Sequence, residues 1–158
     1  MGNVPITKEG YENLRKEFER MRNVVLPENA ADIEVARAHG DLSENAEYKA
    51  AKEKQAFIMG RLKELQDNLT SCEIVEIGKE KNIDKAVFGV TVEVQNQSDG
   101  SSAIYQLVGP YESDINKSKI SVTSPIGRAL IGKTIGDEVT VKTPGGTRKV
   151  DIIDMYYA

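Results

Sequence analysis

The sequence has 158 residues, of which 39% are apolar and 29% charged, and its formal net charge at pH 7 is −4. This length suffices for one compact domain, or for an elongated segment followed by a small domain. The acidic balance argues against a protein that coats nucleic acid, because such proteins carry surplus positive charge to neutralise phosphates. The chain has no apolar run of about 18 residues and no signal-peptide core, so we expect a cytoplasmic protein without a membrane partner.

An apolar pattern of helical period occupies the first part of the chain. Five residues recur at alternating steps of three and four: Tyr11, Leu14, Phe18, Met21 and Val25. This spacing predicts one arm of a coiled coil, with Thr7 as the residue that caps its start. Pro27 fits poorly inside a helix, so we expect a kink or a restart there, with the proline near the first position of the new piece.

The first arm is expected to continue on a weaker apolar stripe, Leu26, Ala30 and Ile33, to about Ala38. Gly40 then suits the left-handed position that ends a helix. A second seam of the same period follows: Tyr48, Ala51, Gln55, Ile58, Leu62, Leu65, Leu69 and Cys72. Two such seams joined by a short turn predict an antiparallel helical hairpin over residues 1–75, with an acidic tip at residues 39–47.

Two further residues of the second arm carry separate expectations. Cys72 is the only cysteine, which excludes an internal disulfide and a cysteine-based zinc site and suggests a buried small hydrophobe. Gly60 costs about 1 kcal/mol in a helix relative to alanine. It marks either a close approach of other backbone or a tolerated cost.

Beyond Cys72 the pattern changes to the alternation typical of strands. The expected strands cover residues 88–94, 104–108, 120–122, 138–143 and 147–155, and Ser124–Leu130 is expected to form one short helix. Ser124 would cap this helix, Pro125 would occupy its first turn, and Gly132 would end it. We therefore expect an α+β domain over residues 80–158, after a linker of about residues 73–80.

The acidic tip contains Asp41 and Glu44, which share a face if the return helix has already begun. One interpretation is structural: the two acids start that helix, with Ser43 as a competing cap. The other is functional. Two carboxylates cannot build a full magnesium or calcium shell, and a hairpin end is no pocket for a small-molecule substrate. The pair would therefore complete a site that another molecule half builds, such as a second metal ion that activates water.

Basic residues flank these acids on both sides. A protonated His39 would suit the C-terminal end of the first arm. Arg37, Lys49 and Lys52 would by default belong to solvated helix faces. Their closeness to the acids would also suit an RNA backbone that runs past the carboxylates.

Several segments together resemble the GreA/GreB family of bacterial transcript cleavage factors. They are residues 36–37, 39–52, 124–133 and 142–146, and the string Gly-Asp-Leu-Ser-Glu-Asn-Ala-Glu-Tyr at residues 40–48 is the most specific of them. The resemblance implies a coiled coil that enters the secondary channel of bacterial RNA polymerase, and a C-terminal FKBP-like antiparallel β domain that binds the channel rim. The acidic balance favours the less basic of the family's two types.

The function implied by this resemblance is that of a transcription elongation factor that is not itself an enzyme. Such a factor stimulates the polymerase's own magnesium-dependent hydrolysis of backtracked RNA and so rescues arrested complexes. By position, Asp41 and Glu44 would support a second magnesium in the polymerase active site, so the chain needs no cofactor of its own.

The resemblance also assigns binding residues. Arg37 and Lys52 would face the displaced 3′ end of the nascent RNA, although an arginine at position 52 would suit bidentate phosphate contact better. Ser124, Pro125 and Ile126 would form part of the polymerase contact. We expect a monomer without a small-molecule substrate.

Three other functions stay open. A channel-binding regulator could inhibit the polymerase without promoting cleavage, and the intact pair of Asp41 and Glu44 argues against it. A peptidyl-prolyl isomerase would need an aromatic-lined pocket, and the spacing of the aromatic residues predicts none. A purely structural coiled-coil protein would dimerise through its seam.

Overall fold

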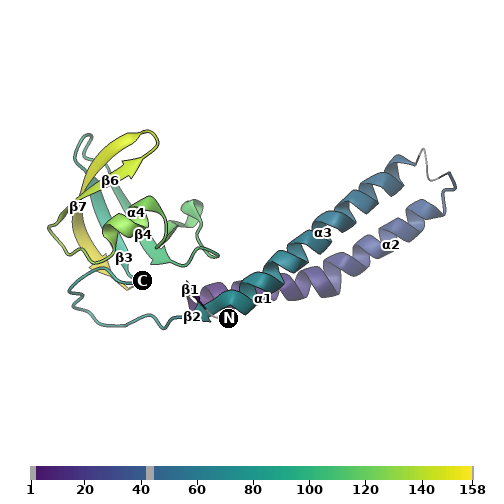
Figure 1. Cartoon of the computed structure of the whole chain (residues 1–158), viewed down its shortest axis with the longest axis horizontal. Coiled ribbons are helices and arrows are strands. Elements are labelled where there is room, and N and C mark those ends of the chain that lie inside the picture. The colour runs from purple at the N-terminus through teal and green to yellow at the C-terminus, as the bar shows by residue number, and fades with distance from the viewer. Residues whose placement is uncertain (1–2, 42–44, 158) are drawn as a thin grey trace. The chain divides into compact units, whose positions relative to one another are not determined.

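The computed structural model describes residues 3–41 and 45–157. Its internal contacts define two compact units (Figure 1). One is a helical hairpin of Tyr11–Ser71, and the other is a β-rich unit made by the residues before Tyr11 and after Ser71. This arrangement confirms the expected α+β class with an N-terminal antiparallel hairpin. The boundaries at residues 75 and 80 stay a prediction. No helix in residues 3–41 or 45–157 is long and apolar enough to cross a membrane.

The first arm of the hairpin is built in three pieces. Helix α1 (Lys8–Arg20) passes into a π-helical segment (Met21–Val25), and α2 (Leu26–Arg37) follows with Pro27 in its first turn. The disturbance expected at Pro27 takes the form of this π segment and not of a restart, because the backbone stays helical at Arg20, Val25 and Leu26. Its cause is local, because proline has no N–H and its ring clashes with the carbonyl four residues earlier, which a wider π turn relieves.

The seam between the arms is buried as the spacing predicts. Every residue of the two predicted seams up to Val25 and from Tyr48 is buried or half-buried in the structure. In the piece between them, Leu26 is half-buried and Ile33 buried as predicted, but the prediction is wrong for Ala30, which is exposed while Asn29 is buried in its place. The seam runs Met21, Val25, Asn29, Ile33, Ala36, and its repeated steps of four reflect the extra residue that the π turn absorbs.

The second arm is a single helix, α3 (Ala46–Ser71), whose Ile58 and Leu65 are almost fully buried. Arg61 of α3 pairs with Glu17 of α1 at 2.9 Å and ties the arms together on their surface. Such part-exposed pairs contribute about 0–1 kcal/mol each. A Cβ added at Gly60 would meet nothing within 4 Å, so this glycine is a tolerated cost and not a close approach.

The β-rich unit contains a five-stranded sheet in the order β5-β4-β3-β7-β6. Its strands are β3 (Thr91–Asn96), β4 (Ser102–Val108), β5 (Lys119–Ser121), β6 (Glu138–Thr143) and β7 (Gly146–Tyr156), and a short 3-10 turn (Ile115–Lys117) precedes β5. The predicted strands are confirmed with shifts of a few residues. All pairs are antiparallel except β4 with β5, which run parallel.

The core of this unit lies on the face of the sheet that helix α4 (Pro125–Leu130) covers. Its fully or almost fully buried side chains include Val92, Val94, Leu107, Ile120, Leu130, Val139, Val141, Val150 and Ile152. Strands β6 and β7, which form a hairpin, curl around α4 in Figure 1. The predicted short helix is confirmed, with Ser124 as its cap and Gly132 at φ +83° after its end.

A second, two-stranded sheet joins residues far apart in the chain. Strand β1 (Val4–Ile6) runs parallel to β2 (Cys72–Ile74), with Val4 opposite Cys72. The predicted linker at 73–80 therefore begins inside a strand. Cys72 is half-buried as the first residue of β2, and burial raises the pKa of its thiol.

The start of α1 is fixed to this same unit. The Thr7 hydroxyl accepts a hydrogen bond from the Gly10 N–H at 3.0 Å, which confirms Thr7 as the helix cap. The Thr7 hydroxyl and N–H both donate to the carboxylate of Glu112. The Gly109 N–H donates to Glu112 as well, at 3.0 Å. Three donors thus hold one half-buried carboxylate, which ties the first turn of α1 to the loop after β4.

Candidate functional site

The first arm of the hairpin ends in an ordered turn. The backbone N–H of His39 donates to Ala36, and that of Gly40 to Arg37. Gly40 adopts φ +102°, a conformation that favours glycine. The positive φ expected for Gly40 is confirmed, but its expected place at C′ is wrong, because Ala38 is the C-cap and Gly40 lies one residue after C′. This turn leads directly into Asp41, which is exposed.

The second arm is started by Asn45. Its Oδ1 accepts a hydrogen bond from the Tyr48 N–H at 3.0 Å, and its Nδ2 donates to the Ala36 carbonyl at 2.6 Å. The structural interpretation of Asp41 as the start of the return helix is therefore wrong, because α3 begins at Ala46. Asparagine caps a helix as well as aspartate does, and here it also bonds to the other arm.

The structural interpretation of the tip also involved Glu44 as the partner of Asp41, and Ser43 as a competing cap. Ser43 and Glu44 lie outside the described residues. Because Asn45 caps α3, helix capping does not account for Asp41.

The basic residues near the tip lie on exposed helix surfaces. Arg37 pairs with Glu34 of its own helix at 3.4 Å, and the Lys52 ammonium donates to the Gln55 side chain at 2.9 Å. No ion pair or hydrogen bond of the described residues joins Arg37 to Lys52. The structure therefore places both cations on the solvated faces expected by default, where their present partners are weakly held.

One contact at the tip could not be predicted from the sequence. His39 Nδ1 lies 3.1 Å from a carboxylate oxygen of Glu47, and both side chains are largely exposed. The pair links the end of α2 to the first turn of α3. Helical spacing rules do not extend across a turn, so the sequence carried no signal for it.

The described residues offer no metal site of their own. Within residues 3–41 and 45–157, no group of three or more His, Cys, Asp or Glu side chains is arranged to hold an ion. The acids of the tip are few for the six or more oxygen ligands that magnesium or calcium requires. A metal near Asp41 would need most of its ligands from another molecule.

The predicted polymerase contact lies at the start of α4. The Ser124 hydroxyl accepts from the Gly127 N–H at 3.1 Å and donates to the Ser121 carbonyl at 2.6 Å. Its hydrogen-bonding capacity is thus largely used within the turn. Pro125 is exposed, whereas Ser124 and Ile126 are both half-buried, so Pro125 is the most accessible residue of the trio.

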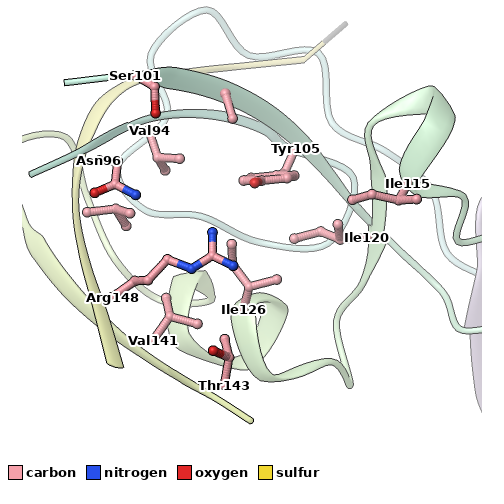
Figure 2. Close-up of a pocket in the computed structure, with 12 residues that line it drawn as sticks. Val94, Asn96, Ser101, Tyr105, Ile115, Ile120, Ile126, Val141, Thr143 and Arg148 are labelled. Carbon is pink, nitrogen blue, oxygen red and sulfur yellow. The ribbon is translucent and has the colours of Figure 1, made fainter. Parts of the chain in front are cut away.

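Ile126 also lines a pocket of about 260 Å³ in the same unit (Figure 2). Its lining is largely apolar and includes Val94, Ile120, Val141 and Val150. Figure 2 shows the Arg148 side chain extending across the hollow, with the Tyr105 ring opposite. Tyr105 is the only aromatic among the lining residues, which gives the isomerase alternative no support.

Arg148 was not among the predicted site residues. In the part of the chain that the structure describes, Arg148 has no salt bridge within 4 Å, and hydrogen bonds from Ser101 and, to a smaller extent, the charge of Arg148 lower the pKa of Asp99. A signal for it existed, because successive side chains of a strand alternate between faces. Arg148 is two residues before the buried Val150 and so belongs to the face that lines the pocket.

Comparison with known proteins identifies the family that has this combination of hairpin and sheet. Residues 4–74 match the family model described as the N-terminal part of GreA/GreB transcription elongation factors, and residues 80–157 match its C-terminal counterpart. The chain belongs to the GreA/GreB family of transcription elongation factors. The family resemblance of the sequence is thereby confirmed.

Individual relatives cover the whole length of this family member. The transcription elongation factor GreA of Syntrophus aciditrophicus is 57% identical over 156 residues, covering 99% of this chain and 96% of the relative. The corresponding protein of Syntrophobacter fumaroxidans is 49% identical over 155 residues, covering 98% and 99%. Among solved structures, GreA factor homolog 1 of Thermus thermophilus is 31% identical, covering 98% and 99%, with a TM-score of 0.44.

Proposed function

We propose that this chain enters the secondary channel of bacterial RNA polymerase and stimulates the polymerase's own hydrolysis of backtracked RNA. The observation that carries the proposal is the tip of the hairpin. Asp41 is exposed in a turn whose helix is started by Asn45, so its carboxylate is not needed as the cap of that helix. Family membership supports the same function. The chain itself would not be an enzyme.

The acids would act by completing a metal site. When bound in the polymerase active site, a magnesium ion polarises a water and the phosphate that this water attacks. Carboxylate oxygens are suitable ligands for magnesium, and the exposure of Asp41 leaves it accessible to a partner's ion. Glu44 would supply the second carboxylate. Neither acid would hold the ion without ligands from the polymerase.

The cations beside the tip would hold the displaced RNA 3′ end. The Arg37 side chain is more than half exposed and forms a long, solvated pair with Glu34. Exchanging such a partner for an RNA phosphate costs little, because the exposed pair is weak and each phosphate contact releases counterions. Lys52 would contribute as a point charge, without the bidentate geometry of arginine.

The β-rich unit would bind the polymerase. Pro125 and Ile126 would provide an apolar contact, and the adjoining pocket would receive an apolar side chain of the polymerase. Arg148, which lines the same pocket, would form an ion pair with a polymerase carboxylate next to that side chain. This contact would leave the tip to act on the RNA.

A cleavage assay on a stalled, backtracked elongation complex tests the proposal. Adding the protein should release short 3′ RNA fragments at a magnesium-dependent rate, and the Asp41→Asn variant serves as the matched control. Polymerase binding without any fragment release would replace the proposal with the alternative of an inhibitory channel regulator. Absence of polymerase binding would contradict both.

A further inference from the structure

Asn29 is a polar residue buried inside the apolar seam of the hairpin. Its side chain is 1% exposed, and its Nδ2 donates to the Ala51 carbonyl of the opposite arm at 3.0 Å. Its Oδ1 is buried and has no hydrogen-bond partner. A buried acceptor left without a partner destabilises the folded state. Asn29 is therefore a poor choice for stability alone.

The seam around Asn29 is weakly specified by packing. Most of the large buried apolar side chains of the described hairpin, Leu14, Ile58 and Leu65, lie in its other half. Between Asn29 and the tip the seam has one large buried apolar side chain, Ile33, and otherwise relies on small residues such as Ala36 and Ala51. Small side chains interdigitate little, so alternative registers of the two helices differ less in packing energy there than between large side chains.

Two side-chain amides supply the missing specificity. Asn29 of α2 donates to the Ala51 carbonyl of α3, and Asn45 before α3 donates to the Ala36 carbonyl of α2. Both bonds cross between the arms, in opposite directions. A slip of one helical turn, about 5.4 Å, would break both of them. Buried asparagines are known to fix the register of coiled coils at a cost in stability.

We propose that Asn29 is a positioning residue, which locks the register of α2 against α3 and so fixes where Asp41 is presented. The inference rests on the proposed function, because presentation matters only if the tip acids act in the polymerase. It predicts an unusual result for an apolar substitution at this position: the protein becomes more stable and less active.

The decisive variant is Asn29→Leu. A hollow of about 410 Å³ borders Asn29, lined among others by Val35 and Ala50, and gives the larger side chain room. The melting temperature should stay equal or rise, because the buried orphan acceptor is gone. Polymerase affinity should be unchanged. The maximal cleavage rate at saturating factor should fall by about 10- to 100-fold, as expected for catalytic groups misplaced by about an ångström.

The register itself is measured without polymerase. Spin labels on the exposed positions Glu28→Cys and Glu53→Cys, in a Cys72→Ser background that leaves no other thiol, report the distance between the arms in the full-length protein. The distance distribution should be narrow with Asn29 and should broaden or shift in Asn29→Leu. Ile33→Val is the matched control, because it weakens the same seam without touching a polar bond. It should lower the melting temperature and leave both the distance and the maximal cleavage rate unchanged.

Each half of the result can overturn the inference. An unchanged distance distribution in Asn29→Leu would exclude the register role, and an altered distribution with undiminished cleavage would exclude the positioning role. A lowered melting temperature alongside reduced cleavage would also overturn it, since lost stability would then explain the defect. If the unmodified protein stimulates no cleavage, the proposed function fails, while the distance measurement still decides the register role.

Discussion

The tip of the hairpin and the core of the β-rich unit are built on opposite principles. Near the tip, short polar contacts such as that of Asn45 with Ala36 and the exposed pair of His39 with Glu47 define the turn. In the sheet, fully buried apolar side chains such as Leu107 and Ile152 define the structure. Substitutions at the tip should therefore change activity without unfolding the chain. Substitutions in the core of the sheet should lower the stability of the chain and leave the activity of the folded protein unchanged.

Removal of either tip carboxylate should give the largest change in activity. Asp41→Asn and Glu44→Gln should each reduce cleavage stimulation by about two orders of magnitude or more, because metal-assisted catalysis supplies several kcal/mol and 1.36 kcal/mol is tenfold in rate. Melting temperature and polymerase affinity should stay unchanged. Asp32→Asn, an exposed acid of the same hairpin, is the control and should keep full activity. Near-normal cleavage at saturating factor would remove the metal-supporting role.

A core substitution should give the largest change in stability. Leu107→Ala should lower the free energy of unfolding by about 2–5 kcal/mol, because it deletes a fully buried side chain. Ile104→Ala on the same strand removes a side chain that is 45% exposed and should cost less than about 1 kcal/mol. Urea unfolding measures both. Equal losses for the two variants would show that β4 has no buried face.

The β-rich unit should depend on residues that precede the hairpin in the chain. Residues 80–158 alone should fold and compete with the full-length protein for polymerase without promoting cleavage. They lack Ile6, which is fully buried, and so should be less stable by about 1.5–3 kcal/mol than a variant whose residues 11–71 are replaced by a short loop.

Circular dichroism and competition binding measure this difference. Equal stability of the two pieces would mean that β1 contributes nothing to the unit. Failure of both to compete, although folded, would place the polymerase contact elsewhere.

Loss of the flanking cations should have a smaller effect than loss of the tip acids. The double variant Arg37→Ala, Lys52→Ala should need about tenfold more factor for half-maximal cleavage, or roughly 1.4 kcal/mol. Its maximal rate should fall less than that of Asp41→Asn, and crosslinking to the transcript 3′ end should weaken. Lys63→Ala, a paired lysine elsewhere on α3, is the control. Unchanged crosslinking would return both cations to a solvated surface.

The smallest change concerns the exposed face of α3. Gly60→Ala should raise the free energy of unfolding by about 0.5–1 kcal/mol, because alanine has the higher helix propensity and the added Cβ meets no atom within 4 Å. Cleavage should be unaffected. A lower melting temperature would contradict the structure of α3 around this residue.

The sequence predicted the helices and strands whose apolar residues recur at a regular spacing. Apolar residues at helical and strand spacing marked both arms, the strands of the larger sheet and α4, since burial imposes a period on the chain. It failed where a single polar residue takes an apolar position. A period of apolar side chains marks Ala30 and not the polar Asn29, and the π turn that shifts the seam has no characteristic amino-acid composition.

The sequence predicted which residues gather at the site better than it predicted how they are arranged. Asp41, Ser43 and Asn45 all satisfy the rule for a helix cap, so the rule could not choose among them. The choice of Asn45 depends on its second bond to Ala36, a tertiary contact that local spacing does not reveal. Strands β1 and β2 have three residues each, too few to show alternation. Arg148 could have been found from the alternation of β7.

The bond between Thr7 and Glu112 has a consequence for the order of folding. The two residues are 105 positions apart, so a chain emerging from the ribosome must present Thr7 long before its carboxylate partner exists. The hairpin arms, with their contacts complete by Ser71, can assemble in the meantime. The hairpin is thus an insertion in a discontinuous domain, and the first strand to be synthesised is among the last elements to be locked in place.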